Sequence, residues 1–415
     1  MKILQLAQFL PPVAGGEERH VWNLARALAA RSHEVTLFGF ATDGAPAGTS
    51  VIDGVRVVRV RSAASRLPAL YSDLSRPHAL PLPDPEVSRA IAREFAVGRY
   101  DIAHAHNWIV NSALRPAAKA AVPLVMTLHD YSHVCATKRL MEHGRNQCPG
   151  PGLRRCLSCA SGHYGPLNGT VTVAANAAAA YRRARRLSEV AAVSSAVADA
   201  VAIPPDHWLH RAGLSARVIP NFIPDDVVVH EIAPTQPGAP FLFAGDLSAD
   251  KGVPVLLDAY RRLEAAPELI LAGRIPGPEE WRFPPGARWV GQLPHEDVVG
   301  LFRSARAVVV PSVWSDPCPT VVLEAMAAGR PVVGSASGGI VDMVVDGQTG
   351  LLVPPGDAIA LAEALATVLR QPESARAFGV AGRDRARKFT VNAVVPRIEQ
   401  MYAEAIESGA GGWPR

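Results

Sequence analysis

The sequence predicts an α/β protein made of two doubly wound domains that face each other across a cleft. Short apolar runs bounded by Gly, Pro or polar turns alternate with longer segments of helical period, which is the pattern of strand–helix–strand units. The alternation stops at a proline-rich stretch near the middle of the chain and then resumes. A chain of 415 residues is long enough for about two or three domains.

The composition excludes several classes of protein. Apolar residues make up 48% of the chain and charged residues 19%, and the net charge is +4. This balance argues against a disordered chain and against a nucleic-acid partner. The N-terminus enters a strand-like run without the features of a signal peptide, and no run reaches the ~18 apolar residues of a membrane span. We therefore expect a cytoplasmic protein.

The first domain is expected to cover residues 1–220. Its best helix is Glu17–Arg31, where Val21, Leu24 and Leu28 recur at helical spacing. A parallel sheet covered by helices on both faces follows from the alternation. The expected strands are Lys2–Gln8, Glu34–Phe40, Val55–Val60, Ile102–His104, Pro123–Leu128 and Val190–Val193.

The second domain is expected to cover residues 241–390, after a linker at 221–240 in which repeated Pro blocks helix and central strand. Residues 391–415 are expected to form a C-terminal helix that packs back on the first domain. The expected strands of the second domain are Phe241–Ala244, Leu269–Ala272, Ala287–Val290, Ala307–Val310, Val332–Gly334 and Leu351–Val353. The expected helices are Val253–Glu264, Asp297–Ser304, Thr320–Ala328 and Asp357–Arg370.

The most informative segment runs from Pro311 to Pro331. It predicts a buried strand, a loop, a helix opened by Pro319 and a glycine stop. The N–H groups and the positive dipole end of such a helix suit sugar hydroxyls or phosphate. Asp316 precedes the helix and Glu324 lies in its second turn, so both carboxylates can face one cavity. From the residues alone, Asp316 serves equally well as a helix cap.

This segment resembles glycosyltransferase family 4, which has two Rossmann-like domains in the GT-B arrangement. The family carries two acidic residues eight positions apart, as Asp316 and Glu324 are, followed by a Gly-Gly turn such as Gly338-Gly339. The stretch from Asp346 to Val353 matches the downstream part, and the resemblance extends over essentially the whole chain.

The resemblance implies a role for each matching residue. Glu324 would hydrogen-bond the ribose of a nucleotide-sugar donor, and Asp316, where the family usually has Glu, would contact the donor sugar. Backbone N–H groups near Cys318, Thr320 and the Gly338-Gly339 turn would hold sugar hydroxyls and phosphate. The base is expected against the stretch from Trp289 to Pro294, including Gln292. UDP and GDP donors both fit this expectation.

A second cluster of candidate residues follows the strand Phe241–Ala244. The family places Arg at the position of Asp246 and Lys at that of Lys251, and both grip the pyrophosphate. Only the lysine is present here, and it lies at a strand-to-helix junction. Arg274, at the end of the next strand, is our candidate for the compensating cation.

The first domain contributes glycines and histidines. Gly15 and Gly16 join the first strand to the first helix, where the family's loop borders the acceptor and the donor phosphate. His129 ends another strand, and the corresponding family histidine lies beside the donor sugar. Without the resemblance, a buried core histidine is the preferred interpretation. His104 and His106 face the same way on a strand and are expected to shape the acceptor side.

Four cysteines, at positions 135, 148, 156 and 159, fall within the segment 130–165, which we interpret as an insertion. A loop this long needs something to order it. Cys135, Cys148, Cys156 and Cys159 could bind a structural zinc ion. Reduced thiols packed in the insertion, or disulfides after export, are the alternatives. No catalytic metal is expected.

A basic patch at Arg182, Arg183, Arg185 and Arg186 has two interpretations: a solvated helix face, or peripheral contact with anionic lipids. For the whole chain we expect a retaining glycosyltransferase that moves a hexose-type sugar from a UDP- or GDP-sugar to a hydroxyl acceptor. The alternatives are an epimerase or phosphorylase of the same fold and a non-catalytic scaffold that binds nucleotide sugars.

Overall fold

A computed structural model of the chain describes residues 1–10, 15–42, 44–66, 79–277 and 281–410. The chain divides into two compact units. The first comprises Met1–His143, Cys148–Pro220 and the residues from Val394 onward. The second comprises Asn221–Ala393 with the short segment Gly144–Gln147. Of the predicted glycine loop after the first strand, residues 11–14 lie outside the described residues.

The first unit is built on an eight-stranded sheet in the order β10-β9-β6-β5-β1-β2-β4-β3. All neighbouring strands run parallel except β3 and β4. The strands are β1 (Lys2–Leu6), β2 (Glu34–Phe40), β3 (Gly48–Ile52), β4 (Val55–Val60), β5 (Ile102–His106), β6 (Leu124–Leu128), β9 (Glu189–Ala192) and β10 (Arg217–Val218).

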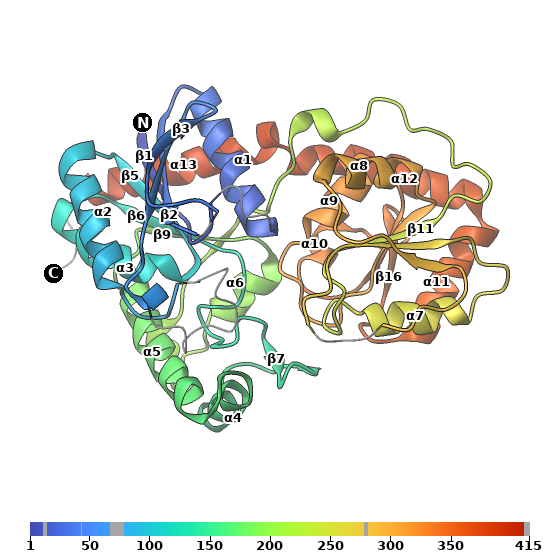
Figure 1. Cartoon of the computed structure of the whole chain (residues 1–415), viewed down its shortest axis with the longest axis horizontal. Helices are drawn as coiled ribbons and strands as arrows, with labels where there is room; N and C mark the ends of the chain where they lie inside the picture. Colours follow the sequence, from blue (N-terminus) through green and yellow to red (C-terminus); the bar gives the residue numbers. More distant parts are fainter. Residues whose placement is uncertain (11–14, 43, 67–78, 278–280, 411–415) are drawn as a thin grey trace. The chain divides into compact units, whose positions relative to one another are not determined.

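Helices cover both faces of this sheet. Figure 1 shows α1 (Gly16–Ala30) on one side, and α2 (Pro85–Gly98) and α3 (Val110–Ala120) on the other. Local sequence explains where α2 begins, because Pro85 fits the first helical position and the Asp84 side chain accepts hydrogen bonds from two N–H groups of the first turn. The first unit also contains α4 (Leu153–Tyr164), α5 (Pro166–Ala184), α6 (Ser195–Val201) and most of α13 (Val391–Ala410).

The second unit has a six-stranded parallel sheet in the order β13-β12-β11-β14-β15-β16. Its strands are β11 (Phe241–Ala244), β12 (Leu269–Ala272), β13 (Ala287–Trp289), β14 (Ala307–Val310), β15 (Val332–Ser335) and β16 (Gly350–Val353). In Figure 1, α8 (His295–Ser304), α9 (Thr320–Ala327) and α12 (Pro372–Ala386) lie on one face, and α7 (Val253–Arg261) and α11 (Ala358–Arg370) on the other. The short α10 (Ile340–Met343) follows β15.

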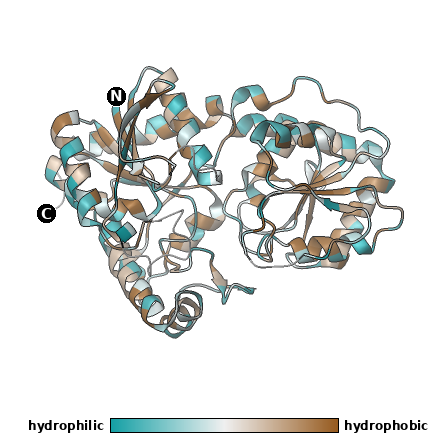
Figure 2. Ribbon diagram, in the orientation of Figure 1, coloured by the Kyte–Doolittle hydropathy of each residue, from teal (hydrophilic) through white to brown (hydrophobic). Residues whose placement is uncertain are grey.

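Each unit has its own apolar core. Figure 2 shows that the strands inside both units are mainly hydrophobic, whereas the helices carry many hydrophilic residues. In the second unit, Phe241, Leu269 and Val309 from neighbouring strands pack against Leu257 of α7 and Leu365 of α11, and all five are buried. Two doubly wound units, as the sequence predicts, are therefore present, while the cleft between them stays a prediction.

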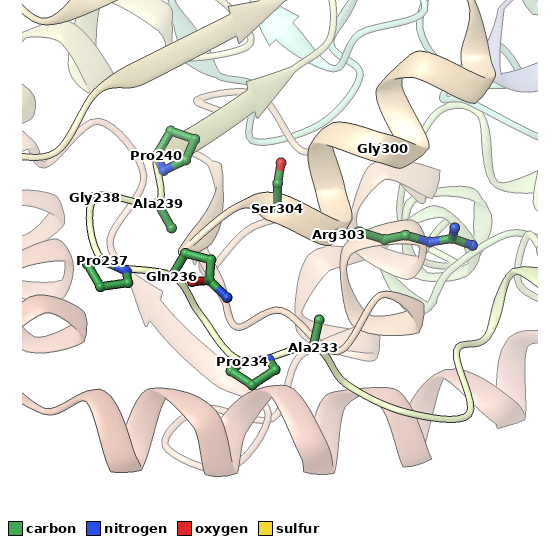
Figure 3. Close-up of a pocket in the computed structure, with 10 residues that line it drawn as sticks. All are labelled: Ala233, Pro234, Gln236, Pro237, Gly238, Ala239, Pro240, Gly300, Arg303 and Ser304. Atoms are coloured by element: carbon green, nitrogen blue, oxygen red, sulfur yellow. The ribbon is translucent and has the colours of Figure 1, made fainter.

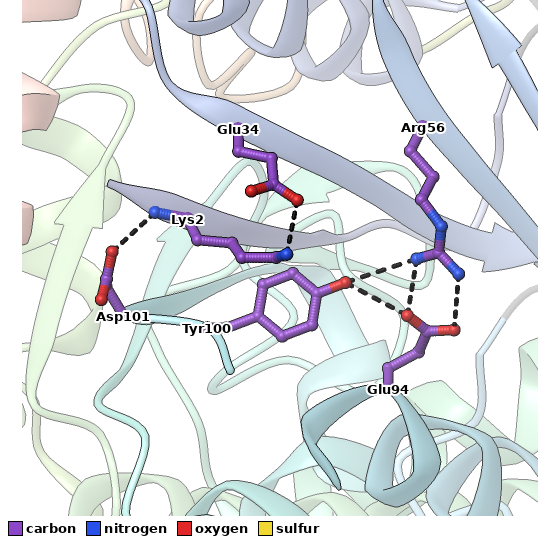
Figure 4. Close-up of polar contacts among 6 residues, drawn as sticks. All are labelled: Lys2, Glu34, Arg56, Glu94, Tyr100 and Asp101. Carbon is purple, nitrogen blue, oxygen red and sulfur yellow. Dashed lines mark hydrogen bonds and ion pairs between the residues drawn. The ribbon is translucent and has the colours of Figure 1, made fainter. Parts of the chain in front are cut away.

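Charged pairs close the amino edge of the first sheet (Figure 4). Lys2, at the start of β1, pairs with Glu34 at the start of β2 at 2.5 Å. Arg56 binds Glu94 through both guanidinium nitrogens, and Tyr100 donates to the same carboxylate. Exposed pairs of this kind contribute little stability. Because these pairs occupy the amino ends of the strands, we look for a site in the loops at the carboxyl ends.

Three elements differ from the prediction. β3 and β10 are strands that the sequence analysis did not include, because they are short and lie at the two edges of the sheet. The insertion contains the hairpin of β7 (Met141–Glu142) and β8 (Asn146–Gln147) and the helix α4, where the sequence suggested a loop. Within the described ranges, no helix has the length and apolar character needed to cross a membrane.

Candidate active site

The topology of the second unit selects the carboxyl ends of β11 and β14. These strands are neighbours at the centre of the sheet. The chain leaves β11 toward β12 on one side and leaves β14 toward β15 on the other. Ligands of open α/β sheets bind outside such a switch point. The segments that follow the two strands contain Lys251 and Asp316.

Lys251 and Asp316 form an ion pair at this position. Lys251 Nζ lies 2.5 Å from Asp316 Oδ2, and Ser312 Oγ donates to the same oxygen at 3.4 Å. Asp316 is 4% exposed, whereas the lysine side chain is 30% exposed and its Nζ lies 5.2 Å from the centre of the Trp314 ring. The two charges that the sequence separates by 65 residues therefore meet in one place.

Two glycines hold the loops around Asp316 close together. Gly338 has a φ of +56°, and a Cβ there would lie 2.2 Å from the Asp316 carbonyl oxygen. The next residue, Gly339, donates its N–H to that oxygen at 2.8 Å. Gly252 has a φ of +77°, and a Cβ there would lie 1.8 Å from the Pro311 carbonyl oxygen. Only glycine allows these approaches, so backbone packing fixes the place of the aspartate.

Helix α9 carries Glu324 in its second turn. The glutamate side chain is 13% exposed, and its Oε1 lies 3.9 Å from His295 Nε2. Both side chains line a small hollow together with Val227 and Val299. Glu324 and Asp316 thus occupy the helix and the loop that follow β14, with different neighbours.

Cys318 and Thr320 flank the start of α9. The carbonyl oxygen of Cys318 accepts a hydrogen bond from Asn221 Nδ2 at 3.0 Å. Burial raises the pKa of the Cys318 thiol to about 12. The thiol is therefore neutral near pH 7, which makes it unsuited to act as a nucleophile.

Arg274 is bound by Asp246. Its Nε and a terminal nitrogen donate to the two carboxylate oxygens of Asp246 at 2.8 and 2.9 Å. Asp246, which stands where the family has arginine, therefore binds Arg274, the cation that we predicted would replace that arginine. Nearby, Trp289 donates its Nε1–H to the Gly273 carbonyl at 2.7 Å, and Gln292 is exposed.

The corresponding switch point of the first unit lies between β1 and β5. Gly15 is the N-cap of α1, Gly16 is its first residue, and Glu17 stands in its first turn. Asn107, directly after β5, has a φ of +58°, and its Nδ2 donates a hydrogen bond to Glu17 Oε2. Burial raises the pKa of Glu17, and Glu18 and Asp130 add to this effect. Strained polar residues of this kind gather at functional sites.

His129 follows β6 and belongs to a cluster of histidine rings. His106 Nδ1 and His129 Nε2 lie 2.9 Å apart, and the ring centres of His20 and His129 are 5.0 Å apart. Burial lowers the pKa of His20 and of His104 to about 3, and it lowers that of His106 well below its usual value. The rings of His20, His104 and His106 are therefore neutral near pH 7.

Comparisons with known proteins identify the family of the chain. A family profile described as Glycosyltransferase Family 4 matches residues 14–227, and one described as Glycosyl transferases group 1 matches residues 239–371. The glycogen synthase of Mycobacterium tuberculosis is 30% identical over 440 aligned residues, which cover 98% of this chain and 95% of that protein. The chain belongs to glycosyltransferase family 4.

Other relatives of this glycosyltransferase act on different molecules. The D-inositol 3-phosphate glycosyltransferase of Kribbella flavida is 28% identical over 96% of this chain and 92% of its own length. Sucrose-phosphate synthase from Thermosynechococcus elongatus has a TM-score of 0.73 at 22% identity, covering 98% and 99% of the two chains. The Anabaena protein HepE, solved with UDP-glucose, has a TM-score of 0.67 at 19% identity, covering 97% and 99%. The predicted GT-B fold and enzyme class are confirmed.

The zinc interpretation of the four cysteines finds no support in the glycosyltransferase. In the residues that the structure describes, no group of three or more His, Cys, Asp or Glu side chains is placed to hold a metal ion. Three of the sulfurs have partners of their own in the backbone: the carbonyl of Met141 for Cys159, that of Gly150 for Cys148, and the N–H of Gly152 for Cys156.

Helix packing orders the insertion instead. Gly169 of α5 lies so close to α4 that a Cβ would be 2.5 Å from the backbone of Ala160. Ala136, Ala160 and Val173 form a small buried core, with Tyr164 packed against it. The long insertion, whose length suggested a metal site, is therefore stabilised by the contact between α4 and α5.

The basic patch is also different from the prediction. Arg182, Arg185 and Arg186 are exposed, but Arg183 is fully buried. Its guanidinium donates to His133 Nδ1, Asn111 Oδ1 and Asn176 Oδ1 at 3.1 to 3.2 Å. Burial lowers the pKa of Arg183 to about 9. This arginine holds the loop after β6 in place and is not available to a lipid headgroup.

The sequence analysis did not identify two polar contacts near the first unit's strand ends. The sequence analysis treated Glu17 as part of a helix, and only its hydrogen bond with Asn107 at the switch point indicates that it belongs to the candidate site. Tyr402 of α13 places its hydroxyl 2.6 Å from His104 Nδ1. The 298 residues between them leave no local signal. The His-x-His spacing at 104 and 106 was the available clue to the histidine cluster.

Proposed function

We propose that this family 4 enzyme is a retaining glycosyltransferase that moves a sugar from a UDP- or GDP-sugar to a hydroxyl acceptor. The observation that carries the proposal is the Lys251–Asp316 ion pair at the switch point of the second unit. A cation and a carboxylate side by side match a donor that has an anionic diphosphate next to a polyhydroxylated sugar.

Each residue of the second unit has a role in this proposal. Lys251 neutralises the departing nucleoside diphosphate, which lowers the barrier electrostatically. Asp316 accepts hydrogen bonds from the donor sugar, and Glu324 accepts them from the ribose. Cys318 and Thr320, at the start of α9, and Gly338 place backbone groups around the donor, while Gly339 N–H is used to hold Asp316. The base lies against the stretch that contains Gln292.

The retaining course is implied by the resemblance to the family, and the described candidates include no suitable nucleophile for a double displacement. Asp316 is already paired with Lys251, and the thiol of Cys318 is neutral. We therefore propose displacement on one face of the sugar, in which the bond from the anomeric carbon to the diphosphate oxygen breaks while the bond to the acceptor oxygen forms. The leaving phosphate takes the acceptor proton. His129, from the first unit, contacts the donor sugar.

The proposal is tested with a panel of nucleotide sugars. Thermal stabilisation and slow hydrolysis identify the donor, and release of nucleoside diphosphate measures turnover. Glu324→Ala should abolish turnover, which would also exclude a non-catalytic scaffold. NMR of the early product should show that the anomeric configuration is kept, and an inverted product would refute the retaining course. If no acceptor raised the release of nucleoside diphosphate above the rate of slow hydrolysis, an epimerase or phosphorylase would be favoured.

A further inference from the structure

A continuous series of side chains runs through the first unit from α13 to His129. The hydroxyl of Tyr402 contacts His104 Nδ1 at 2.6 Å, and His104 Nε2 contacts Thr127 Oγ1 at 2.8 Å. The ring centres of His104 and His106 are 4.3 Å apart, and those of His106 and His129 are 5.1 Å apart. His104 and His106 are fully buried.

The bond between His106 and His129 restricts both rings. His106 Nδ1 and His129 Nε2 are 2.9 Å apart, which is a normal hydrogen-bond length. Burial keeps the His106 ring neutral, so each of its nitrogens is either a donor or an acceptor. One ring must donate to the other. The two rings therefore adopt complementary arrangements: where His106 Nδ1 donates, His129 Nε2 accepts, and where His106 Nδ1 accepts, His129 Nε2 carries the proton.

Among the described residues, no other polar contact of His106 explains why a histidine occupies this buried position. Its Nε2 is buried without a hydrogen-bond partner, a cost that a protein avoids when an apolar side chain would fill the space as well. The ring lies on His104, which is itself held by Thr127 and Tyr402. The one polar contact that His106 makes through Nδ1 is directed at His129.

We infer that His106 is a positioning residue, which sets the ring orientation and the tautomer of His129 for contact with the donor sugar. The inference rests on the proposed role of His129. A catalytic group that is displaced by about 1 Å loses on the order of 100-fold in rate. The loss of His106 should therefore reduce kcat by about 10- to 100-fold, with little change in the KM for the nucleotide sugar, which the second unit binds.

The experiment compares three variants of the full-length enzyme with the best donor from the panel. His106→Leu removes the hydrogen bond. His106→Asn keeps an amide near the position of Nδ1 and should restore part of the lost kcat. His106→Gln places its amide near the position of Nε2 and should not. Thermal unfolding of each variant checks that the first unit is folded, and if the leucine variant is not, the asparagine and glutamine variants carry the comparison.

A double-mutant cycle shows whether His106 acts through His129. His129→Gln should lower kcat, and the double variant with His106→Leu should be no worse than His129→Gln alone. Ring ¹⁵N shifts, with His129 assigned from the spectrum of His129→Gln, should show one tautomer in the wild type and a mixture in His106→Leu. A single unchanged tautomer in His106→Leu would overturn the inference.

The outcomes separate this inference from the proposed function. If His129→Gln reduces kcat and His106→Leu does not, His106 is not a positioning residue and the proposed function stands. If His129→Gln retains full activity while Glu324→Ala is inactive, the role of His129 fails, and the inference fails with it. If Glu324→Ala and His129→Gln are both fully active, the proposed function itself is wrong.

Discussion

The carboxyl edges of the two sheets occupy the same topological position and carry different chemistry. In the second unit, Lys251 and Asp316 place two full charges at the switch point. In the first unit, the rings of His20, His104 and His106 are buried and neutral. Two sheets of similar winding therefore present an ion pair in one case and neutral hydrogen-bonding rings in the other. The side chains, and not the fold, decide what each edge binds.

Solvent access explains the difference. The Lys251 side chain is 30% exposed, so water reaches part of it. His104 and His106 have no exposed surface, so charging either ring would require desolvation of a cation. The first edge is thereby suited to hydroxyl groups, and the second to an anion.

Acidification should produce the largest effect, and it should act on the first unit. Burial holds the pKa of His20, His104 and His133 at about 3 and that of His106 well below the usual 6.5. Below pH 6.5 the unfolded chain binds protons that the folded unit does not, so stability is full above that pH and is lost as pH falls toward 3. Between pH 7 and pH 5.5 we expect a loss on the order of 1 kcal/mol per histidine, and of several kcal/mol for the four together.

Hydrogen exchange read separately for each unit measures this effect. Amides of β5 and β6 should lose protection at pH 5.5, after correction for the intrinsic exchange rate, while those of β11 and β14 should keep it. Equal losses in the two sheets would show that the histidines do not set the difference.

Loss of the ion pair should have the next largest effect. Lys251→Met removes the cation beside Asp316 and should reduce kcat/KM by roughly 10²- to 10³-fold, because electrostatic stabilisation of the leaving group is lost. Lys388→Met is the matched control, since this lysine belongs to the same unit and is exposed. Steady-state release of nucleoside diphosphate gives the ratio. A Lys251→Met enzyme as active as the control would remove the charged edge from the mechanism.

The glycine clasp on Asp316 allows a finer comparison. Gly338→Ala should destabilise the second unit by about 1–3 kcal/mol and reduce activity, because its Cβ would collide with the Asp316 carbonyl. Gly347→Ala is the control: its φ is +66°, but a Cβ there would meet nothing within 4 Å. It should show the backbone strain alone. Urea unfolding and kcat/KM of both variants test this, and equal effects would mean that close packing at Asp316 is unimportant.

Tyr402→Phe should have the smallest effect. The substitution removes one hydrogen bond to His104 and should cost about 1 kcal/mol, measured by urea unfolding of the first unit. The ring itself stays in place and keeps its edge contact with His104. A loss above about 3 kcal/mol would exceed what one hydrogen bond contributes and would indicate that α13 detaches.

Much of the fold could be predicted from local patterns, because buried parallel strands are apolar along their whole length. Runs such as Phe241–Ala244 and Ala307–Val310 are strands with the same bounds in the structure. β3 carries Gly, Thr and Ser and is mostly exposed, so its burial pattern gives no signal. Helix α4 carries two of the cysteines that suggested a metal site, and it packs against α5, a tertiary contact that a local pattern does not contain.

The candidate site could be predicted only where its residues lie close together in the sequence. Asp316, Glu324 and the Gly338-Gly339 turn stand close in sequence and could be identified together. The pairing of Asp246 with Arg274 and the histidine series ending at Tyr402 depend on which strands are neighbours. Sheet order arises from packing across the whole unit, so no local pattern contains it.

The return of α13 to the first unit has a consequence for synthesis. Glu399 binds Arg31 and His33, and Tyr402 contacts His104. Glu399 and Tyr402 are nevertheless translated after the whole of Asn221–Ala393. The groove that receives the helix stays uncovered on the ribosome while the second unit is made. The domain that emerges first is thus the one that finishes last, and chaperones have the longest access to its exposed apolar surface.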